Sequence, residues 1–358
     1  MSPKGAVKVI GCGLIGTSIA LRLKEEGFDI FLVDRNNAHE KLASDLLGSS
    51  ANGLMDGQFR AILIATPIEH IFDIAMSEFA TNPRAIIIEV GGLKSELNVQ
   101  VEGFSELSKN FVSVHPMSGR EKSGPAAARS DLFESRAWIV SKNSKTSDEA
   151  VELGYEFGRL MGASIYELDP VAHDEIMAVV SHLPQILSSA LAANLLGERA
   201  DFLNLSGQGL RDVTRLADSD PALWTALLVG NSKSVNKKLD EVINRLINLK
   251  EAIAARNLDS IESFFSAGRD GRNLIPGKHG AAARDYTYLP IVIEDKPGEL
   301  ARIINECANI SVNIEDLAIE HSPGQQSGLI TLALSEIDAI KLQKHLVAKG
   351  WLAHAPRK

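Results

Sequence analysis

Cysteine is scarce in this chain, and its scarcity bears on both redox setting and metal binding. The 358 residues include two cysteines, Cys12 and Cys307, which we expect to lie in separate domains. So few cysteines fit a reducing cytoplasm better than a disulfide scaffold. Neither cysteine stands at a spacing typical of a metal site, so we expect no metal.

Excess positive charge and long apolar runs are also lacking. Acidic residues outnumber basic ones by 46 to 37, which gives a formal net charge of −9. This balance counts against binding of nucleic acid or anionic lipid, because both require clustered positive charge. The strand-like residues 7–10 follow the N-terminus too closely for a signal core, and no unbroken apolar run is long enough to span a bilayer. We therefore expect a cytoplasmic protein that acts on a small molecule.

The composition that is present, 45% hydrophobic and 23% charged, is typical of folded globular proteins. We expect a dinucleotide-binding domain over 1–146, a helical substrate and dimerisation domain over 147–278, and a small domain over 285–358. In the first, apolar runs alternate with helical stretches, which predicts a Rossmann-type, doubly wound α/β fold with a parallel sheet. The expected strands are 7–10, 30–33, 61–65, 85–89, 111–114 and 137–140.

Helical patterns dominate the second domain, apart from a short strand-like run at 164–167. An apolar seam with spacings of three and four residues favours either packing within the chain or dimerisation, and both stay open; it consists of Leu239, Val242, Leu246, Leu249 and Ile253. The Gly- and Arg-rich stretch 268–284 indicates a linker. Beyond it, a βαββαβ order predicts an antiparallel sheet with two helices on one face.

A glycine-rich turn follows the first expected strand and opens an amphipathic helix. Gly11 allows the tight turn, Gly13 lets a pyrophosphate approach the backbone, and Gly16 permits close packing of the helix on the sheet. Free N–H groups at the helix N-terminus suit phosphate. We therefore expect a dinucleotide at the sequence Gly11-Cys12-Gly13-Leu14-Ile15-Gly16.

Two later positions are expected to complete the cofactor site. Asp34 ends the second expected strand, eighteen residues after Gly16, where it can accept hydrogen bonds from an adenosine ribose. A carboxylate there would repel a 2′-phosphate, which favours NAD over NADP, although Arg35 beside it weakens the preference. Thr66-Pro67 ends the third expected strand at the edge where open α/β sheets bind ligands; a simple strand-to-helix turn explains it equally well.

Chemistry-bearing side chains follow in two places. His115 stands at the end of the fifth expected strand, beside the predicted cofactor site, and suits a general base that takes a hydroxyl proton. On the helical pattern 174–196, a polar stripe interrupts apolar residues and either faces solvent or lines a cleft; we favour the cleft. Pro184 within it suits a kinked helix. The stripe consists of Glu175, His182, Gln185 and Ser189.

Two arginines precede a helix start at Asp220-Pro221. Arg211 and Arg215 are one turn apart, and a guanidinium fork is the usual clamp for a substrate carboxylate. A surface salt bridge with Asp212 or Asp218 explains them as well, and the residues alone leave both interpretations open.

These residues together resemble prephenate dehydrogenases, a family that also includes arogenate and cyclohexadienyl dehydrogenases. The resemblance covers roughly 7–273 and rests on the run H-P-M-S-G-R-E-K-S-G from His115, on Ser181-His182-Leu183-Pro184, and on the stretch from Asp212 to Trp224. It implies that NAD takes a hydride while the ring carboxylate leaves as carbon dioxide, which converts prephenate to 4-hydroxyphenylpyruvate in tyrosine biosynthesis.

The resemblance also implies residue roles. His115 would receive the hydroxyl proton and Arg215 would bind a substrate carboxylate. The remaining implied substrate-site residues are His182, Gln185, Trp224, Lys94 and the polar gate Glu121, Arg211 and Asp212.

Two positions depart from the family pattern. Gly92 stands where the family usually has serine, and Ser95 is displaced by three positions. Gln185 replaces the second histidine of the usual H-L-P-H, which leaves the choice between prephenate and arogenate open.

The last segment separately resembles an ACT domain. This resemblance implies an amino-acid effector, with tyrosine expected, and pairing of the small domains in a homodimer. It rests on Asp295, Pro297 and Gly298 in the loop after the first strand of that domain and on Asn313.

Two other functions stay open. A 3-hydroxyacid dehydrogenase or pyrroline-carboxylate reductase shares the expected domain pair, although the H-P-M-S-G run counts against both. A non-catalytic sensor of NAD and amino acids would explain Gly92 and Gln185 as lost chemistry.

Overall fold

The computed structural model describes residues 4–48, 59–118, 124–275, 286–294, 296–321 and 327–357. The chain divides into two compact units, Met1–Asn248 and Leu249–Lys358, and each is described by itself.

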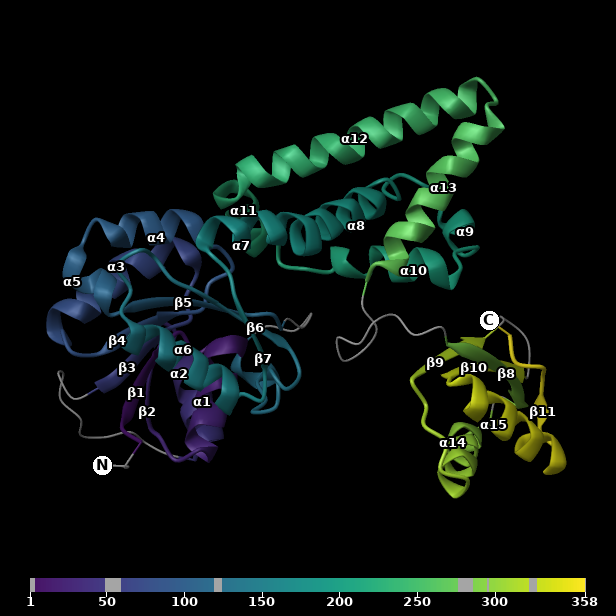
Figure 1. The fold of residues 1–358 in the computed structure, drawn as a ribbon, viewed down its shortest axis with the longest axis horizontal. Coiled ribbons are helices and arrows are strands. Elements are labelled where there is room, and N and C mark those ends of the chain that lie inside the picture. Colours follow the sequence, from purple (N-terminus) through teal and green to yellow (C-terminus); the bar gives the residue numbers. More distant parts are fainter. Residues whose placement is uncertain are drawn as a thin grey trace. The chain divides into compact units, whose positions relative to one another are not determined.

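A seven-stranded sheet forms the centre of the first unit, with strand order β2-β1-β3-β4-β5-β6-β7 (Figure 1). All neighbouring strands are parallel except β5 and β6, which are antiparallel. The six expected strands are present, and β7 is added at the edge. The strands are β1 (Ala6–Ile10), β2 (Asp29–Val33), β3 (Phe59–Ile64), β4 (Ile86–Glu89), β5 (Phe111–Pro116), β6 (Ala137–Ser141) and β7 (Ser164–Glu167).

Both faces of this sheet are covered, as the continuously apolar strands predict. Val7 and Val9 of β1 belong to one buried cluster, whereas Ala6 and Ile10 belong to the other, because successive side chains of a strand point to opposite faces. The first cluster includes Ile19 of α1. The helices around the sheet are α1 (Leu14–Glu25), α2 (Asn37–Leu47), α3 (Ile68–Thr81), α4 (Ser95–Glu102), α5 (Ser105–Lys109) and α6 (Asp148–Leu160), with a short 3-10 turn η1 (Pro125–Ala127).

The direction of β6 and the extent of the sheet differ from expectation. Parallel pairing requires a crossover, usually a helix, and the described part of the β5–β6 connection contains only η1. The chain therefore returns antiparallel instead of continuing the parallel sheet. Residues 148–167, assigned above to the helical domain, form α6 and β7 of this sheet.

The strand order reverses beside β1, because β2 lies on one side of it and β3 on the other. Ligands of open α/β sheets bind outside the carboxyl ends of the strands at such a switch point. The glycine turn follows β1, and Thr66 follows β3. The topology thus brings both predicted cofactor elements to one edge.

Helices make up the rest of the first unit, and the last of them, α12, continues past Asn248 into the second. Asp169 caps the first of them by accepting N–H groups of Val171 and Ala172, and Asp220 caps another through Ala222. Each is followed by proline, and the second cap confirms the helix start predicted at Asp220-Pro221. The elements are α7 (Pro170–Met177), the π-helical turn η2 (Ala178–His182), α8 (Leu183–Ala193), α9 (Ala200–Leu203), α10 (Gln208–Thr214), the 3-10 turn η3 (Arg215–Ala217), α11 (Pro221–Gly230) and α12 (Ser232–Ala254).

The second unit contains α13 (Leu258–Asn273) and a four-stranded antiparallel sheet of order β11-β8-β10-β9. Its βαββαβ order matches the expectation, with β8 (Thr287–Glu294), α14 (Glu299–Asn309), β9 (Asp316–His321), β10 (Ser327–Leu334), α15 (Glu336–Ala348) and β11 (Leu352–Ala353). Helix α13 ends at Asn273, inside the stretch 268–284 expected to be a linker. Residues 276–285 lie outside the described residues.

Candidate active site

The glycine turn has the geometry that a nucleotide requires. Gly11 has φ +99°, and a Cβ there would lie 2.4 Å from the Ala65 carbonyl oxygen; a Cβ on Gly16 would lie 2.0 Å from the Gly11 oxygen. At Gly13, by contrast, no described atom lies within 4 Å of an added Cβ. Two glycines are therefore required by packing, and the middle one opens onto the space that a pyrophosphate would take. Leu14 and Ile15 begin α1 directly behind it.

Asp34 is tied to this turn. The Cys12 N–H donates to its Oδ2 at 2.6 Å, and the Asp34 N–H donates to Glu40 Oε2 at 3.0 Å. Two carboxylates therefore stand at the end of β2, while Arg35 is exposed beside them. Burial raises the pKa of the Cys12 thiol to about 12, which leaves it protonated and unsuited to nucleophilic or metal chemistry.

Thr66 and Pro67 lie where expected, between β3 and α3, with Pro67 as the N-cap of that helix. The Thr66 hydroxyl oxygen is buried and has no hydrogen-bond partner among the described residues. Buried hydroxyls are usually paired, so this one fits a group that a bound nucleotide would satisfy. The described residues contain no group of three or more His, Cys, Asp or Glu side chains that could hold a metal ion.

A fully buried ion pair lies next to this edge. Lys94 Nζ is 2.5 Å from Glu89 Oε1, and both side chains have no exposed surface. The same ammonium donates to the carbonyl oxygens of Gly91 and Val114, each at 2.8 Å. Three acceptors thus use all three of its protons. Lys94 was expected to touch the substrate; here it instead joins the end of β4 to the strand that carries His115.

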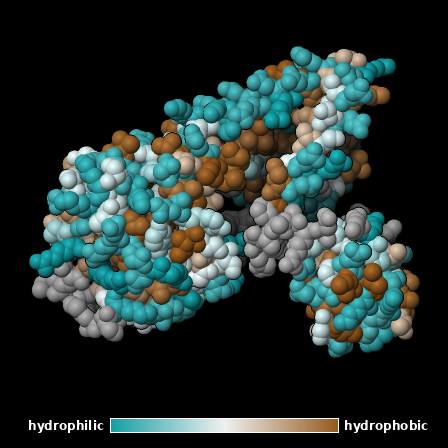
Figure 2. Space-filling model, in the orientation of Figure 1, coloured by the Kyte–Doolittle hydropathy of each residue, from teal (hydrophilic) through white to brown (hydrophobic). Residues whose placement is uncertain are grey.

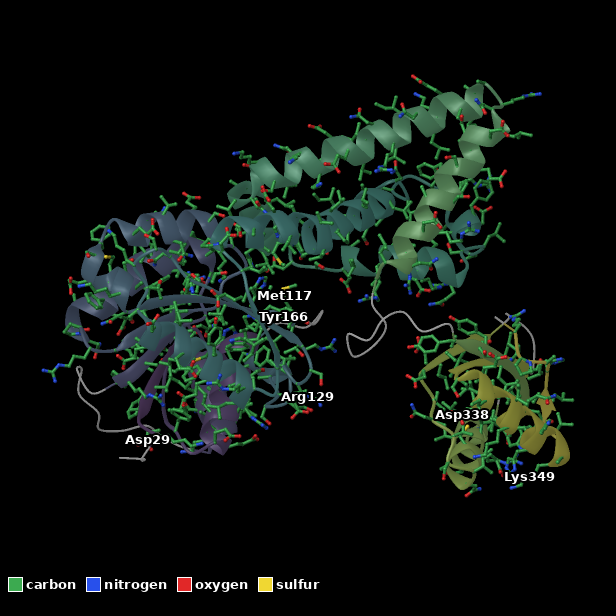
Figure 3. All side chains as sticks on the ribbon, in the orientation of Figure 1. Asp29, Met117, Arg129, Tyr166, Asp338 and Lys349 are labelled. Carbon is green, nitrogen blue, oxygen red and sulfur yellow. The ribbon has the colours of Figure 1, made fainter. Side chains whose placement is uncertain are left out.

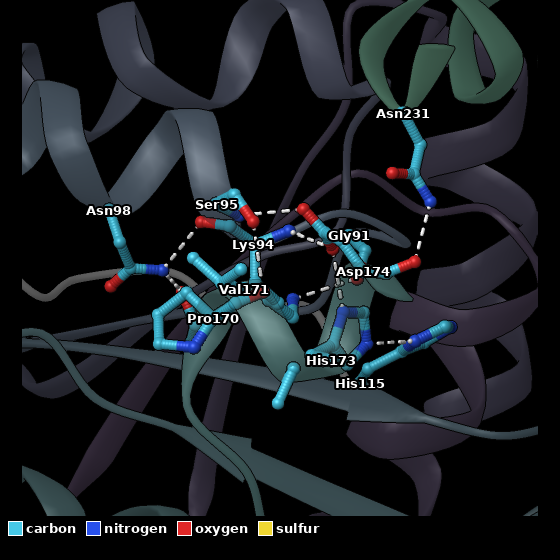
Figure 4. Close-up of polar contacts among 12 residues, drawn as sticks. Gly91, Lys94, Ser95, Asn98, His115, Pro170, Val171, His173, Asp174 and Asn231 are labelled. Atoms are coloured by element: carbon cyan, nitrogen blue, oxygen red, sulfur yellow. Dashed lines mark hydrogen bonds and ion pairs between the residues drawn. The ribbon is translucent and has the colours of Figure 1, made fainter. Parts of the chain in front are cut away.

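His115 belongs to a line of three ionisable side chains (Figure 4). Its Nδ1 is 2.8 Å from Nε2 of His173, whose Nδ1 is 2.8 Å from Oδ1 of Asp174. The Asp174 carboxylate also accepts the N–H groups of Lys94 at 3.0 Å and Ser95 at 2.9 Å, at the start of α4. Burial is the largest influence on His115 and lowers its pKa well below the usual value, with Lys94, His173 and His182 adding to it. A neutral imidazole at the sheet edge is suited to accept a proton.

His182 is directed inward by an unusual turn of helix. The Leu183 N–H bonds to the Ala178 oxygen, five residues back, so the helix widens by one residue just before Pro184. A proline has no N–H and its ring clashes with the preceding turn of an α-helix, which the wider turn relieves. Such π turns are frequent at functional sites. His182 is only 2% exposed.

Asn231 and Trp224 both contact the His182 ring. The Asn231 Nδ2 group donates to the Asp174 carbonyl oxygen at 2.7 Å and lies 3.2 Å from His182 Nδ1. Because an amide nitrogen only donates, His182 Nδ1 accepts and its Nε2 carries the hydrogen. The Trp224 ring meets the His182 ring edge-on, with centroids 6.0 Å apart.

Gln185 faces the protein instead of an open pocket. It is 6% exposed, and its amide donates to the Leu216 oxygen at 2.8 Å and to Ser189 Oγ at 3.3 Å. Leu216 follows Arg215 in η3, so Gln185 fastens the turn that carries this arginine. Within the polar stripe, His182 and Gln185 are buried and Glu175 is exposed.

The structure describes three of the four residues expected to form the carboxylate clamp and the polar gate. Arg215, Arg211 and Asp212 are exposed on neighbouring turns, and Asp212 accepts from Gln208 Nε2 at 2.7 Å. Glu121 lies outside the described residues. Of the loop after β5, the beginning is described: Met117 donates its N–H to the Ala137 oxygen at 2.8 Å (Figure 3).

The two departures from the family pattern have structural explanations. A Cβ on Gly92 would lie 2.8 Å from Leu227 Cδ2 of α11, so this position packs closely against the helical part. Ser95 does not supply the missing hydroxyl, because its Oγ donates to the Pro170 oxygen at 2.9 Å.

Four residues that surround His115, Lys94 and His182 were not predicted from the sequence: Glu89, His173, Asp174 and Asn231. Glu89, the last residue of β4, and Asp174, within α7, gave only a weak signal, because acidic residues near strand ends and helix starts are common. Their roles follow from contacts between segments far apart in the chain.

A large apolar surface lies on the helices of the same unit. Figure 2 shows hydrophobic residues gathered beside α12 and over α8. Those exposed between a third and two thirds include Ile176, Val180, Leu187, Leu191, Leu246 and Ile247. The helical run Pro170–Ala193 is the one helix in the described chain that is long and apolar enough, by length and composition alone, to cross a membrane, although polar residues interrupt its apolar sequence. His173, Asp174, His182 and Gln185 of this run are buried in the polar contacts above.

Comparisons with known proteins agree with the fold and with the expected family. The family models for the prephenate dehydrogenase nucleotide-binding domain and dimerization domain match residues 19–167 and 169–267. A probable prephenate dehydrogenase from Streptomyces niveus is 27% identical, over 97% of this chain and 99% of its own. The Aquifex aeolicus prephenate dehydrogenase crystallised with hydroxyphenyl propionate and NAD+ has a TM-score of 0.68 and 26% identity, covering 76% of this chain and 98% of its own.

A third similar protein is named for arogenate, the alternative substrate. The Synechocystis arogenate dehydrogenase structure has a TM-score of 0.63 and 26% identity, covering 75% of this chain and 98% of its own. The Rossmann-type sheet, the neutral histidine at its edge and these matches lead to one assignment: the chain belongs to the prephenate dehydrogenase family.

Proposed function

We propose that this enzyme uses NAD to oxidise and decarboxylate prephenate, giving 4-hydroxyphenylpyruvate. The observation that carries the proposal is the position of His115, a partly buried neutral imidazole near the carboxyl end of β5, at the sheet edge where the nucleotide turn follows β1. The family models and the NAD+ in the Aquifex aeolicus structure support the cofactor.

The residues divide the work as follows. Bound NAD would accept the hydride from the ring carbon that bears the hydroxyl. His115 takes the hydroxyl proton, and the ring carboxylate leaves as carbon dioxide while the ring becomes aromatic. The protein therefore needs only to orient the donor carbon, accept one proton and hold two anionic groups. Arg215 and the Nε2–H group of His182 are the proposed donors for those anions, and Trp224 lies beside His182.

Two features favour NAD over NADP and leave room for the pyrophosphate. Asp34 and Glu40 place two carboxylates where a 2′-phosphate would lie, and like charges repel. The open position at Gly13 and the unpaired Thr66 hydroxyl lie at the same edge.

Prephenate is favoured over arogenate by the state of Gln185. Its amide donates to the Leu216 backbone oxygen, and a neutral glutamine supplies no carboxylate for the ammonium group of an aminated substrate. Three of the four curated relatives carry the name prephenate dehydrogenase.

One assay tests the activity directly. Purified enzyme is incubated with NAD or NADP and with prephenate or arogenate, while reduced nicotinamide and carbon dioxide are followed. We expect turnover with NAD and prephenate. Binding of NAD without turnover of either substrate would instead support the sensor function.

We also propose that the enzyme is a homodimer through the apolar surface of α8 and α12. Aliphatic side chains such as Leu187 and Ile247 are 38% and 47% exposed there, and contiguous exposed apolar surface commonly marks an interface. The dimerization-domain name of the family model supports this. Sedimentation should give twice the chain mass, and Leu187→Asp with Ile247→Asp should give monomers.

The small domain is proposed to be an ACT-like module that binds an amino-acid effector, with tyrosine as the candidate. Its βαββαβ order and antiparallel sheet support this. Gly298 caps α14 with φ +94° after Pro297, Asn313 bonds Glu315 at 2.9 Å, and Asp295 lies outside the described residues. A truncation ending near residue 284 should keep activity and lose tyrosine sensitivity; retained sensitivity would contradict the proposal.

A further inference from the structure

The hydrogen bonds around Asp174 determine where one proton of His173 lies. Both carboxylate oxygens accept backbone N–H groups, from Lys94 and Ser95. These bonds, with the His173 contact, hold the pKa of Asp174 below its usual value despite burial. An ionised carboxylate can only accept. The His173 Nδ1 atom, 2.8 Å from Oδ1, must therefore carry a hydrogen.

The same logic extends to His115. Burial lowers the pKa of His173, so the ring is neutral near pH 7 and its Nε2 has a lone pair once Nδ1 is protonated. That lone pair lies 2.8 Å from His115 Nδ1, which must then be the donor. In a neutral imidazole the other nitrogen is unprotonated, so His115 Nε2 is left as the base.

We propose that His173 and Asp174 are a positioning pair for His115: they fix its Nδ1–H tautomer and stabilise the positive charge that it gains with the substrate proton. This inference rests on the proposed function. The hydroxyl proton goes to His115 Nε2, and the Nδ1–H bond to His173 is retained and strengthened by the charge. Neither positioning residue touches the substrate.

Other charged groups face this line and do not replace Asp174. Lys94 and Glu89 lie behind it but neutralise each other at 2.5 Å. His182, in the π turn, carries no charge when neutral, and its ring is held by Asn231. The Asp174 carboxylate, with a side chain only 7% exposed, is therefore the anion that reaches His115 through a ring.

A structural role alone is the competing explanation, because Asp174 also joins α7 to the start of α4. The tautomer separates the two explanations. Protein labelled with ¹⁵N-histidine reports which ring nitrogen is protonated, and loss of one set of signals in His115→Asn assigns that ring. We expect Nδ1–H for His115 in the substrate-free enzyme. An Nε2–H form would overturn the proposal, whether or not prephenate is the substrate.

Two replacements of His173 give the kinetic test. Gln can still accept the His115 proton through its side-chain oxygen, whereas Met, of similar length, cannot accept it well. We expect His173→Met to lower kcat by about 10²–10⁴-fold, the range of general-base catalysis, with KM nearly unchanged. His173→Gln should keep the His115 tautomer and recover at least about tenfold of that loss, since the acceptor is kept.

Asp174→Asn and a matched control complete the experiment. The amide oxygen should take the Oδ1 position, where the Lys94 N–H and the His173 Nδ1–H both donate. The His115 tautomer is then kept and only the charge that stabilises protonated His115 is lost, so we expect kcat to fall with KM nearly unchanged. Asp169→Asn removes the same charge at the exposed N-cap of α7 and should leave kcat unchanged. Equal kcat for His173→Met and His173→Gln, with the wild-type tautomer in both, would show a structural role only. A wild-type enzyme without turnover would refute the proposed function and leave the tautomer test intact.

Discussion

The Gln185 side chain donates a hydrogen bond of 2.8 Å to the carbonyl oxygen of Leu216, the residue that follows Arg215. This contact joins α8 to the turn η3 and ties the position of the arginine to a buried amide. It also explains why the replacement of a family histidine at this position need not remove function.

Gln185→Ala should therefore weaken substrate binding more than chemistry. Losing the bond leaves a buried carbonyl unpaired, which costs about 1–3 kcal/mol locally, and loosens the turn. We expect KM for prephenate to rise about tenfold with kcat changed less than twofold, by the relation of about 1.4 kcal/mol per factor of ten. Steady-state kinetics checks this. Asn194→Ala, which removes an exposed bond within α8, is the control, and an unchanged KM for Gln185→Ala would contradict the prediction.

His115→Asn should abolish most turnover and leave NAD affinity intact. Asn cannot accept the proton as a base, so kcat should fall by about 10²–10⁴-fold. Because burial holds the pKa of His115 below its usual value, the wild-type kcat/KM should stay level through neutral pH and fall only in the acid range. Titration of NAD fluorescence checks binding separately. A wild-type rate in the variant would remove His115 from the mechanism.

Gly13→Ala and Gly16→Ala should behave differently. The added Cβ at Gly13 meets no described atom within 4 Å, whereas at Gly16 it would lie 2.0 Å from a backbone oxygen. We expect Gly13→Ala to keep the melting temperature and lose NAD affinity, and Gly16→Ala to lower the melting temperature itself. Thermal melting with and without NAD measures both. Equal melting temperatures in the two variants would argue against these separate roles.

Breaking the Glu89–Lys94 pair should lower the free energy of unfolding. Removing one partner of a buried ion pair leaves an uncompensated charge, which destabilises a protein by about 3–5 kcal/mol. We expect Lys94→Met to lose that much in urea unfolding, and Glu89→Gln combined with Lys94→Met to lose less than Lys94→Met alone. If the double variant were the less stable of the two, the pair would not be the source of the loss.

The small domain should lose a stabilising contact in acid. Hydrogen bonds from Lys349 and His345 lower the pKa of Glu306 to about 2 from 4.5, and Lys349 is labelled in Figure 3. A depressed carboxyl pKa adds stability above the unfolded-state pKa, which is lost as pH falls through the folded-state pKa. The melting difference between wild type and Glu306→Gln should be full above pH 4.5 and vanish toward pH 2. A constant difference across that range would contradict the assignment.

Much of the fold could be predicted because it depends on local patterns. Continuous apolar strands and the glycine turn predicted the sheet and its ligand edge, and His115 was predicted from its place at the carboxyl end of the fifth strand. The direction of β6 could not be predicted, because it depends on a connection without a crossover helix. The roles of His173 and Asp174 were missed since they arise where α7 meets α4 and β5, segments separated by 58 to 80 residues.

The wide turn η2 determines how a deletion of one residue before Pro184 would act. A plain α-helix between the same two ends would contain one residue fewer, and each residue of an α-helix accounts for about 100° of rotation, since 3.6 residues make one turn. Shortening the chain by one position before Pro184 would therefore preserve the helix on either side, yet it would redirect the imidazole of His182 away from Asn231. The number of residues in this turn is therefore a requirement for the site alongside the histidine itself.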